Sequence, residues 1–271
     1  MPAPRAGLAP SAGPSSLRAV RVRKLQQRRG WTFTLGAMIL RPTFLLTTKP
    51  HWVGGTRIPA TGGCVLALNH ISHVDPLTAA VFTHDHGRLP RYLAKAGLFD
   101  NKALGLFMRS AGQIPVERAS RSAVGAYDAA VAAVRAGECI VVYPEGTITR
   151  DPDLWPMKGK SGAARIALET GCPVIPIGQW GAQALLAPYA KKPDLFPRKR
   201  IDIRVGDPVD LSDLVDRPRT AEVLAEATER IMAAITAIVE EIRGETAPAE
   251  RFDPRTAGVA EIGNPHRKDV P

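Results

Sequence analysis

The chain has 271 residues and a formal net charge of +10, from 36 Lys and Arg against 26 Asp and Glu. This length allows one α/β domain with appendages or two small domains, and the charge requires an anionic partner such as nucleic acid, anionic lipid or a phosphorylated substrate. The three cysteines form no C-x-x-C pair, which argues against a cysteine zinc site and indicates reduced core residues in a protein facing the cytosol.

The N-terminal region changes composition twice. Residues 1–16 are rich in Ala, Pro, Gly and Ser and are predicted to be disordered. Residues 17–46 join a basic cluster to a broken apolar stretch. The basic residues are Arg18, Arg21, Arg23, Lys24, Arg28 and Arg29. Arg41 and Pro42 interrupt the apolar stretch, so no run approaches the roughly 20 residues that a spanning helix needs.

A signal peptide is not expected either, because the charged part lies late and no small-residue cleavage site follows. The pattern predicts an interfacial anchor, with apolar side chains in the headgroup boundary and basic side chains on anionic lipid. The alternative is a basic helix that packs on its own domain.

Short apolar runs alternate with helix-like segments along the rest of the chain. We expect strands at residues 64–68, 113–116, 139–143, 173–178 and 201–205. We expect helices at residues 120–136, 160–170 and 220–244, with Gly244 as the stop of the last. Such alternation predicts an α/β layered domain at residues 47–244. Prolines and mixed charges predict an extended, solvated tail at residues 245–271.

The first candidate site is the stretch VLALNHISHVDPLTAA, residues 65–80. Along a helix, His70 and Asp75 would point about 140° apart. Pro76 disfavours the α region at Asp75, so residues 69–76 are predicted to form a loop or distorted turn. A loop allows Asp75 to accept a hydrogen bond from one imidazole nitrogen and leaves the other nitrogen to take a proton. The alternative is a strand-end histidine with a satisfied side chain.

Two further strand ends carry polar groups. Arg118 ends the segment SAGQIPVER, where a strand meets a loop and a guanidinium can bind phosphate. The run CIVVYPEGT ends with Glu145, Gly146 and Thr147. Gly146 permits close backbone approach to a ligand, and successive amides can face an anion. Each feature alone is also compatible with a surface charge or a simple turn.

Other patterns are excluded. The segment around Lys160, KGKSGAA, is not a P-loop, because Leu154 stands where that motif needs its first glycine. No G-x-S-x-G is present, so a serine-hydrolase nucleophile elbow is missing. His84 and His86 form a possible metal pair without further ligands around them, and a surface loop is the better interpretation. We therefore expect no metal and no cofactor.

Taken together, these motifs resemble the PlsC-type lysophosphatidic acid acyltransferases of the glycerolipid acyltransferase superfamily. Asn69-His70 through Asp75 is similar to the first family motif, NH(x4)D, and GQIPVER, residues 112–118, to the second. YPEGT, residues 143–147, resembles the third, F-P-E-G-T, and CPVIPIG around Pro176 resembles the fourth. The four motifs keep the family order over roughly residues 50–205.

The resemblance implies a layered α/β fold of the glycerol-3-phosphate acyltransferase kind, with a mixed sheet flanked by helices and a membrane-associating N-terminal helical segment. It implies His70 as general base and Asp75 as the residue that orients it. It implies phosphate binding by Arg118, with Lys160 as a second cation. Glu145, Gly146 and Thr147 match acceptor-binding positions, and backbone amides near Gly146 are candidate oxyanion donors.

The expected reaction moves a fatty acyl group from an acyl thioester to the free hydroxyl of lysophosphatidic acid, giving phosphatidic acid in phospholipid biosynthesis. The donor is acyl-CoA or acyl carrier protein. One residue departs from the family pattern: Ile148 stands where the third motif usually continues with Arg. Either Arg150 replaces that arginine, or Arg118 and Lys160 hold the phosphate without it. Another lysolipid, glycerol 3-phosphate or a glycolipid therefore remains an alternative acceptor.

Two other classes of function compete with this one. An inactive membrane-bound binding protein would keep this fold, but His70, Asp75, Arg118 and Glu145 are intact. A nucleic-acid partner would use the basic N-terminus and a second basic group. That group comprises Lys191, Lys192, Arg198, Lys199, Arg200 and Arg204. Few aromatic residues and no stacking platform accompany it, so a lipid-facing or solvated surface is favoured. We expect a peripheral or monotopic protein on the cytoplasmic face of the cell membrane.

Overall fold

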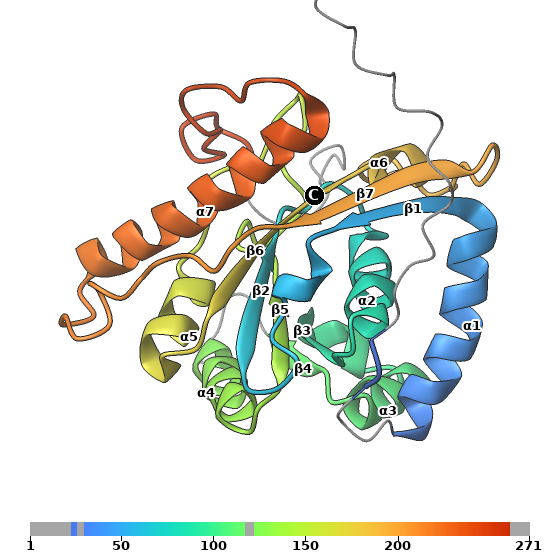
Figure 1. Cartoon of the computed structure of the whole chain (residues 1–271), viewed down its shortest axis with the longest axis horizontal. Coiled ribbons are helices and arrows are strands. Elements are labelled where there is room, and N and C mark those ends of the chain that lie inside the picture. The colour runs from blue at the N-terminus through green and yellow to red at the C-terminus, as the bar shows by residue number, and fades with distance from the viewer. Residues whose placement is uncertain (1–22, 26–29, 117–121, 261–271) are drawn as a thin grey trace, which may run out of the picture.

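The computed structural model describes residues 23–25, 30–116 and 122–260. A seven-stranded sheet forms the middle layer, in the order β1-β7-β6-β2-β5-β3-β4 (Figure 1). The strands are β1 (Thr48–Val53), β2 (Cys64–Leu68), β3 (Pro90–Lys95), β4 (Ile114–Val116), β5 (Cys139–Val142), β6 (Val174–Trp180) and β7 (Lys199–Val205). The helices are α1 (Trp31–Thr47), α2 (Asp75–Asp85), α3 (Lys102–Ser110), α4 (Ser122–Arg135), α5 (Gly162–Thr170), α6 (Ala182–Leu185) and α7 (Ala221–Arg243), with 3-10 turns at Gly55–Arg57 and Ala96–Phe99.

The sheet is mixed. Strands β2 to β6 pair in parallel, β7 pairs antiparallel with β6, and β1 is parallel to β7. All five residues of β2 are buried, as expected for a strand covered on both faces. Val65 and Ala67 face a core with α4, α5 and α7, whereas Cys64, Leu66 and Leu68 face a second core with α1 and α2. The predicted α/β layered fold is confirmed.

The five predicted strands and the three predicted helices are all present. Helix α7 ends where expected, since Gly244 adopts a left-handed φ of 67° and its amide donates to the Glu240 carbonyl. The prediction of a turn at residues 69–76 was partly wrong. Asp75 is the first helical residue of α2, because Pro76 lies in the first turn, where a proline costs no helical hydrogen bond.

Helix α1 has two different faces. Phe44 is buried and Arg41 pairs with Asp85 of α2 at 3.0 Å, so the helix packs on the domain. Its other face is open and apolar. The exposed residues there are Trp31, Leu35, Met38, Ile39 and Leu46. None of the helices in residues 23–25, 30–116 and 122–260 is long and apolar enough to cross a membrane. The residues of the basic cluster other than Arg23 and Lys24 lie outside the described residues.

Most of residues 245–260 are exposed, as the predicted solvated tail requires, but part of this segment also contacts the domain. Phe252 accepts a hydrogen bond from the Lys158 amide at 2.9 Å, and Asp253 pairs with the Lys158 ammonium at 3.0 Å. Arg150 donates to the carbonyl of Ala260 at 3.1 Å. This segment therefore packs against the loop between β5 and α5. Among the charged side chains of the tail, Asp253 makes this contact.

Candidate active site

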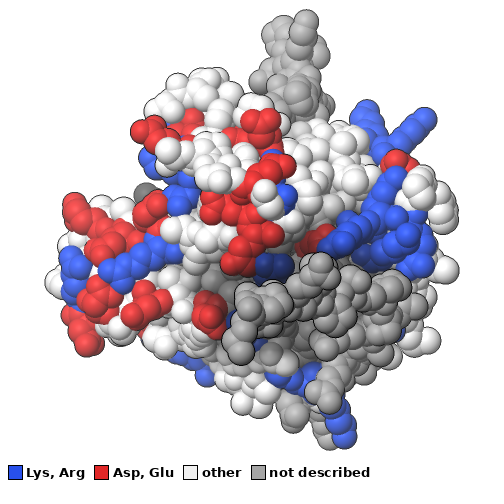
Figure 2. Space-filling model, turned by 45° about the horizontal axis from the view of Figure 1, so that its top comes forward, with Lys and Arg blue, Asp and Glu red and all other residues white. Residues whose placement is uncertain are grey.

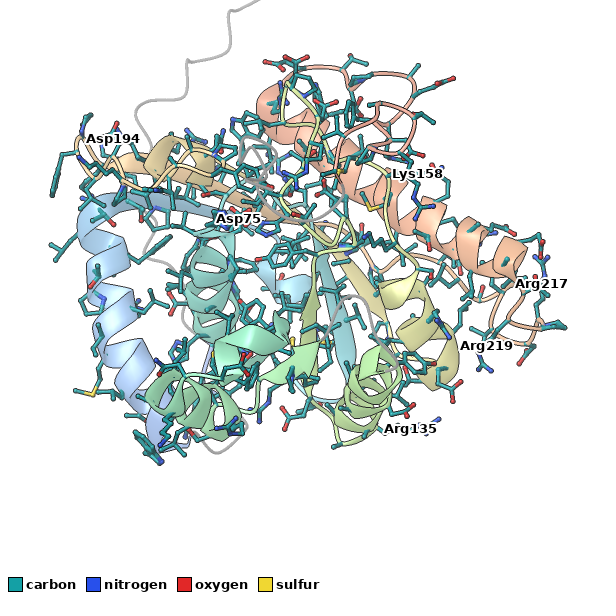
Figure 3. The ribbon with its side chains drawn as sticks, turned by 180° about the vertical axis from the view of Figure 1, so that it is seen from behind. Asp75, Arg135, Lys158, Asp194, Arg217 and Arg219 are labelled. Carbon is teal, nitrogen blue, oxygen red and sulfur yellow. The ribbon has the colours of Figure 1, made fainter. Side chains whose placement is uncertain are left out.

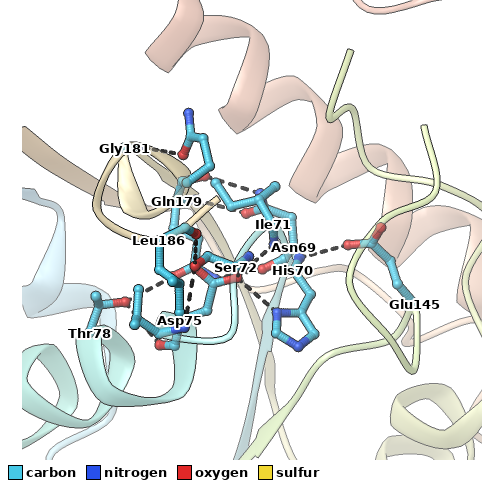
Figure 4. A network of polar contacts seen from close by, with 12 residues as sticks. Asn69, His70, Ile71, Ser72, Asp75, Thr78, Glu145, Gln179, Gly181 and Leu186 are labelled. Carbon is cyan, nitrogen blue, oxygen red and sulfur yellow. Dashed lines mark hydrogen bonds and ion pairs between the residues drawn. The ribbon is translucent and has the colours of Figure 1, made fainter. Parts of the chain in front are cut away.

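The loop after β2 is held at its start by a reciprocal amide pair (Figure 4). The side chain of Asn69 donates to the Gln179 carbonyl at 3.0 Å and accepts from the Gln179 amide at 2.8 Å. The Gln179 side chain donates back to the Asn69 carbonyl at 2.7 Å. Both residues are fully buried. This pair joins the carboxyl end of β2 to β6 and fixes where the next residue, His70, leaves the sheet.

His70 and Asp75 lie together, as the sequence predicts. The Nδ1 atom of His70 is 2.8 Å from Oδ2 of Asp75. The same carboxylate oxygen accepts from the amides of Ile71 at 2.6 Å and Ser72 at 2.8 Å. Three donors thus converge on one oxygen of a fully buried side chain. When Nδ1 donates to Asp75, Nε2 carries the lone pair, so the ring is prepared to accept a proton there.

Glu145 supports His70 from the next strand. Its carboxylate accepts from the His70 amide at 2.7 Å and from the Met157 amide at 3.0 Å. Burial raises the pKa of this carboxyl to about 8, although both hydrogen bonds oppose the shift. The side chain is fully buried and its two oxygens bond backbone groups. The geometry therefore gives Glu145 a positioning role, in place of the acceptor contact that the resemblance implies.

Tyr143 packs against the imidazole ring of His70. Its ring stacks on His70 with centroids 4.4 Å apart and an interplanar angle of 28°. The backbone carbonyl of His70 accepts from the Thr149 amide at 2.8 Å. Both peptide groups and one flat face of His70 are thereby fixed. Sequence reasoning assigned no role to Tyr143 or to Asn69, although both lie inside the motifs that it identified.

A large apolar cavity of about 1010 Å³ opens beside His70. Helices α1 and α2 supply much of its wall, including Phe33, Leu40 and Ala80. Its polar end holds His70, Gly146 and Lys160. The volume is at the upper end for small-molecule sites, and the apolar lining suits a long hydrocarbon chain. A base at the edge of this cavity can deprotonate one reactant while the hydrocarbon chain of the other reactant occupies the cavity.

The anion-binding candidates are only partly brought together. Gly146 has a φ of 75°, and the methylene groups of Lys160 lie 3.2–3.3 Å from the position that a Cβ on Gly146 would take. Thr147 is buried. The Gly146 amide donates to the Tyr143 carbonyl at 2.9 Å, so this amide serves the turn and is not an oxyanion donor in this conformation. Arg118 lies outside the described residues.

Arg165 is a cation near the candidate site that the motifs did not indicate. Arg165 of α5 also lines the cavity and lies over the Tyr127 ring, 5.2 Å from its centroid. The sequence feature that could have indicated Arg165 is its position one helical turn after Ser161, the N-cap of α5. The start of α5 thus supplies two cations to the cavity lining, Lys160 just before the helix and Arg165 within it.

The structure places Arg150 away from the cavity, which bears on whether it replaces the arginine that the family has at position 148. Its guanidinium bonds the Tyr189 hydroxyl and the Ala260 carbonyl and lies 5.0 Å from the Tyr189 ring centroid. It does not line the apolar cavity. Ile148 is 1% exposed and packs inside the turn. Arg150 is therefore not a substitute for the family arginine, which leaves Arg118 and Lys160 as the predicted phosphate ligands.

Comparisons with known proteins agree with this geometry. Residues 50–180 match the family model described as Acyltransferase. The chain is 29% identical over 177 residues to the 1-acyl-sn-glycerol-3-phosphate acyltransferase of Bacillus subtilis, covering 64% of this chain and 80% of that one. It is 24% identical over 188 residues to the protein of the same name from Streptococcus pneumoniae, covering 69% and 65%.

A solved structure shares the fold. The 1-acyl-sn-glycerophosphate (LPA) acyltransferase PlsC from Thermotoga maritima superposes with a TM-score of 0.60 at 23% identity. The match covers 80% of this chain and 81% of that one. The layered arrangement around the sheet is therefore common to both proteins.

Proposed function

Because the chain belongs to the acyltransferase family, with relatives named 1-acyl-sn-glycerol-3-phosphate acyltransferase, we propose that it acylates lysophosphatidic acid. The acyl group comes from a thioester, and the product is phosphatidic acid. The single observation that carries this proposal is the His70–Asp75 pair, 2.8 Å apart, at the polar end of the apolar cavity.

The reaction follows from the position of the base. Nε2 of His70 takes the proton of the acceptor hydroxyl as its oxygen attacks the thioester carbonyl, and Asp75 stabilises the imidazolium that forms. The new C–O bond replaces the C–S bond, and the departing sulfur takes the proton from His70. This direct transfer requires no covalent acyl-enzyme intermediate. The cavity of about 1010 Å³ receives an acyl chain during the step.

Lys160 and Arg165 both line the cavity, and the acceptor phosphate is held by Lys160 with Arg118 as its second ligand. The donor is acyl-CoA or an acyl carrier protein. The enzyme works at the cytoplasmic surface of the membrane. Contact with a membrane is supported by the exposed apolar face of α1, whose opposite side contributes Phe33 and Leu40 to the cavity wall.

A thioester-release assay with an acceptor panel tests the proposal. Purified protein is given acyl-CoA or acyl carrier protein with lysophosphatidic acid, glycerol 3-phosphate or another lysolipid, and lipid products are identified by mass spectrometry. Release should depend on lysophosphatidic acid and yield phosphatidic acid, and His70→Ala should abolish both. Release without an acceptor would indicate a thioesterase, and product from another acceptor alone would reassign the substrate.

A further inference from the structure

A second apolar projection lies far from the N-terminal segment in sequence. The loop between α6 and β7 exposes every residue from 191 to 198. At its tip, Phe196 is 69% and Leu195 is 39% exposed. Four cations lie within five residues of this pair, at Lys191, Lys192, Arg198 and Arg200. An exposed aromatic and aliphatic pair among cations is unfavourable in water and has the composition of an interfacial insertion element.

The loop is fastened to the end of α1. The guanidinium of Arg198 donates to the Thr48 carbonyl at 3.0 and 2.5 Å, and Thr48 caps helix α1. Thr48 is also the β1 partner of Lys199 in the sheet. Leu46, two residues before Thr48, is 68% exposed. The loop tip and the open face of α1 therefore meet at one corner of the molecule.

The figures place this corner on one side of the protein. Asp194, in the loop, projects on the side of α1, and Arg217 projects from the opposite end (Figure 3). Lys and Arg side chains gather at the edge where β1 and β7 lie, whereas the far edge carries acidic and basic side chains in mixture (Figure 2). The exposed residues of α1 follow a helical repeat, at positions 31, 35, 38, 39 and 46. Apolar groups and positive charge thus share one surface.

We propose that the loop at residues 190–200 is a second membrane contact, which inserts Leu195 and Phe196 into the headgroup region of an anionic bilayer. Lys191 and Lys192 contact lipid phosphates, and the open face of α1 rests on the same leaflet. The pairing of charge with exposed apolar side chains favours a bilayer over a soluble acidic partner. Two contacts, separated by about 150 residues in the chain and joined through Thr48 and Arg198, fix the orientation of the domain.

Vesicle sedimentation of the full-length protein tests this contact. The vesicles contain phosphatidylcholine with or without phosphatidylglycerol, at low and high salt. Leu195→Ser with Phe196→Ser should weaken binding to anionic vesicles about tenfold, on the order expected for apolar side chains withdrawn from the interface. Lys191→Ser with Lys192→Ser should weaken it about fivefold for each cation and reduce the salt dependence.

Matched controls lie on the opposite side. Val215 is 38% exposed, nearly as exposed as Leu195, so Val215→Ser controls for the loss of an exposed apolar group. Arg135→Ser with Arg217→Ser removes the same charge as the lysine pair. Both controls should bind like the wild type. Equal losses in the controls, unchanged binding of the Leu195/Phe196 variant, or dependence on the lysines alone would each overturn insertion of the loop.

This contact is independent of the acyl-transfer chemistry. Turnover on detergent-dispersed substrates should be unchanged in the loop variants, and their thermal unfolding should match that of the wild type because the replaced side chains are exposed. Lost turnover without a bilayer would assign the loop to catalysis and would overturn the proposal. Absence of acyl transfer in the wild-type protein would instead contradict the proposed function and leave the vesicle result valid.

Discussion

Replacing Asp75 by Asn separates two ways in which a carboxylate can serve His70. An amide could present its NH2 group to Nδ1 and force the wrong tautomer. The structure opposes this arrangement, because the oxygen that faces Nδ1 also accepts from the amides of Ile71 and Ser72. Two backbone donors require an oxygen at that position. Asp75→Asn should therefore keep the tautomer of His70 and lose only the negative charge.

The size of the loss follows from the geometry. The Nδ1–Oδ2 distance of 2.8 Å places the centres of charge of an imidazolium and the carboxylate roughly 4 Å apart. At an effective dielectric constant near 20, that separation corresponds to about 4 kcal/mol of attraction. Turnover should fall about 10³-fold, since about 1.4 kcal/mol corresponds to a factor of ten.

Initial rates of thiol release from acyl-CoA, with saturating lysophosphatidic acid, measure the effect. Asp85→Asn is a matched control. Asp85 is also a buried aspartate of α2, but it pairs with Arg41 of α1. The control should lose stability and keep most of its turnover. A correctly folded Asp75→Asn enzyme within tenfold of wild-type turnover would refute the proposed role of the charge.

Four other changes have defined outcomes. The pKa of Glu145 rises from 4.5 to about 8 on folding, so the free energy of unfolding of the wild type should fall as pH rises through that window, by about 3 kcal/mol between pH 5 and 8. Denaturant unfolding of Glu145→Gln should lack this pH dependence. Equal pH dependence in the two proteins would contradict the raised pKa of Glu145. Gly146→Ala should lower the free energy of unfolding by about 1–2 kcal/mol in a denaturant titration, because φ is 75° there. The variant should also raise the acceptor KM by displacing Lys160. An unchanged KM would show that Lys160 does not bind the acceptor phosphate. Gly36→Leu should shift donor preference toward shorter acyl chains in competition assays, since Gly36 lines the cavity. Ile148→Arg should lower thermal stability and turnover without lowering the acceptor KM.

Local patterns were sufficient to predict much of the fold. The runs that became β2 and β5 are continuously apolar because helices cover both faces of the sheet. His70 and Asp75 were predictable as a pair because they lie only five positions apart in the sequence. Strand β1, TKPHWV, carries polar and apolar residues at an edge of the sheet and gave no comparable signal. Its partner β7 was found from its own alternation.

The supports of His70 were not predictable from local pattern. Asn69 and Gln179 are 110 residues apart, and Glu145 is 75 residues from His70. Only the order of strands brings them together, because β2 lies between β5 and β6. A motif position such as Glu145 therefore suggested a ligand contact when considered alone. In the structure it holds the peptide group of the base.

The consequence for Ile148 depends on these supports. This side chain lies between Glu145, which accepts from the His70 amide, and Thr149, which donates to the His70 carbonyl. With 1% of its surface exposed, an arginine there must bury an unpaired charge or turn outward and move Thr149. Either response displaces His70, so turnover falls while phosphate binding gains nothing. The volume-conserving variant Ile148→Met should keep turnover, and its cost should stay below about 1.5 kcal/mol. If Ile148→Arg instead lowered the acceptor KM at wild-type stability, position 148 would face the phosphate, and the packing argument would be wrong.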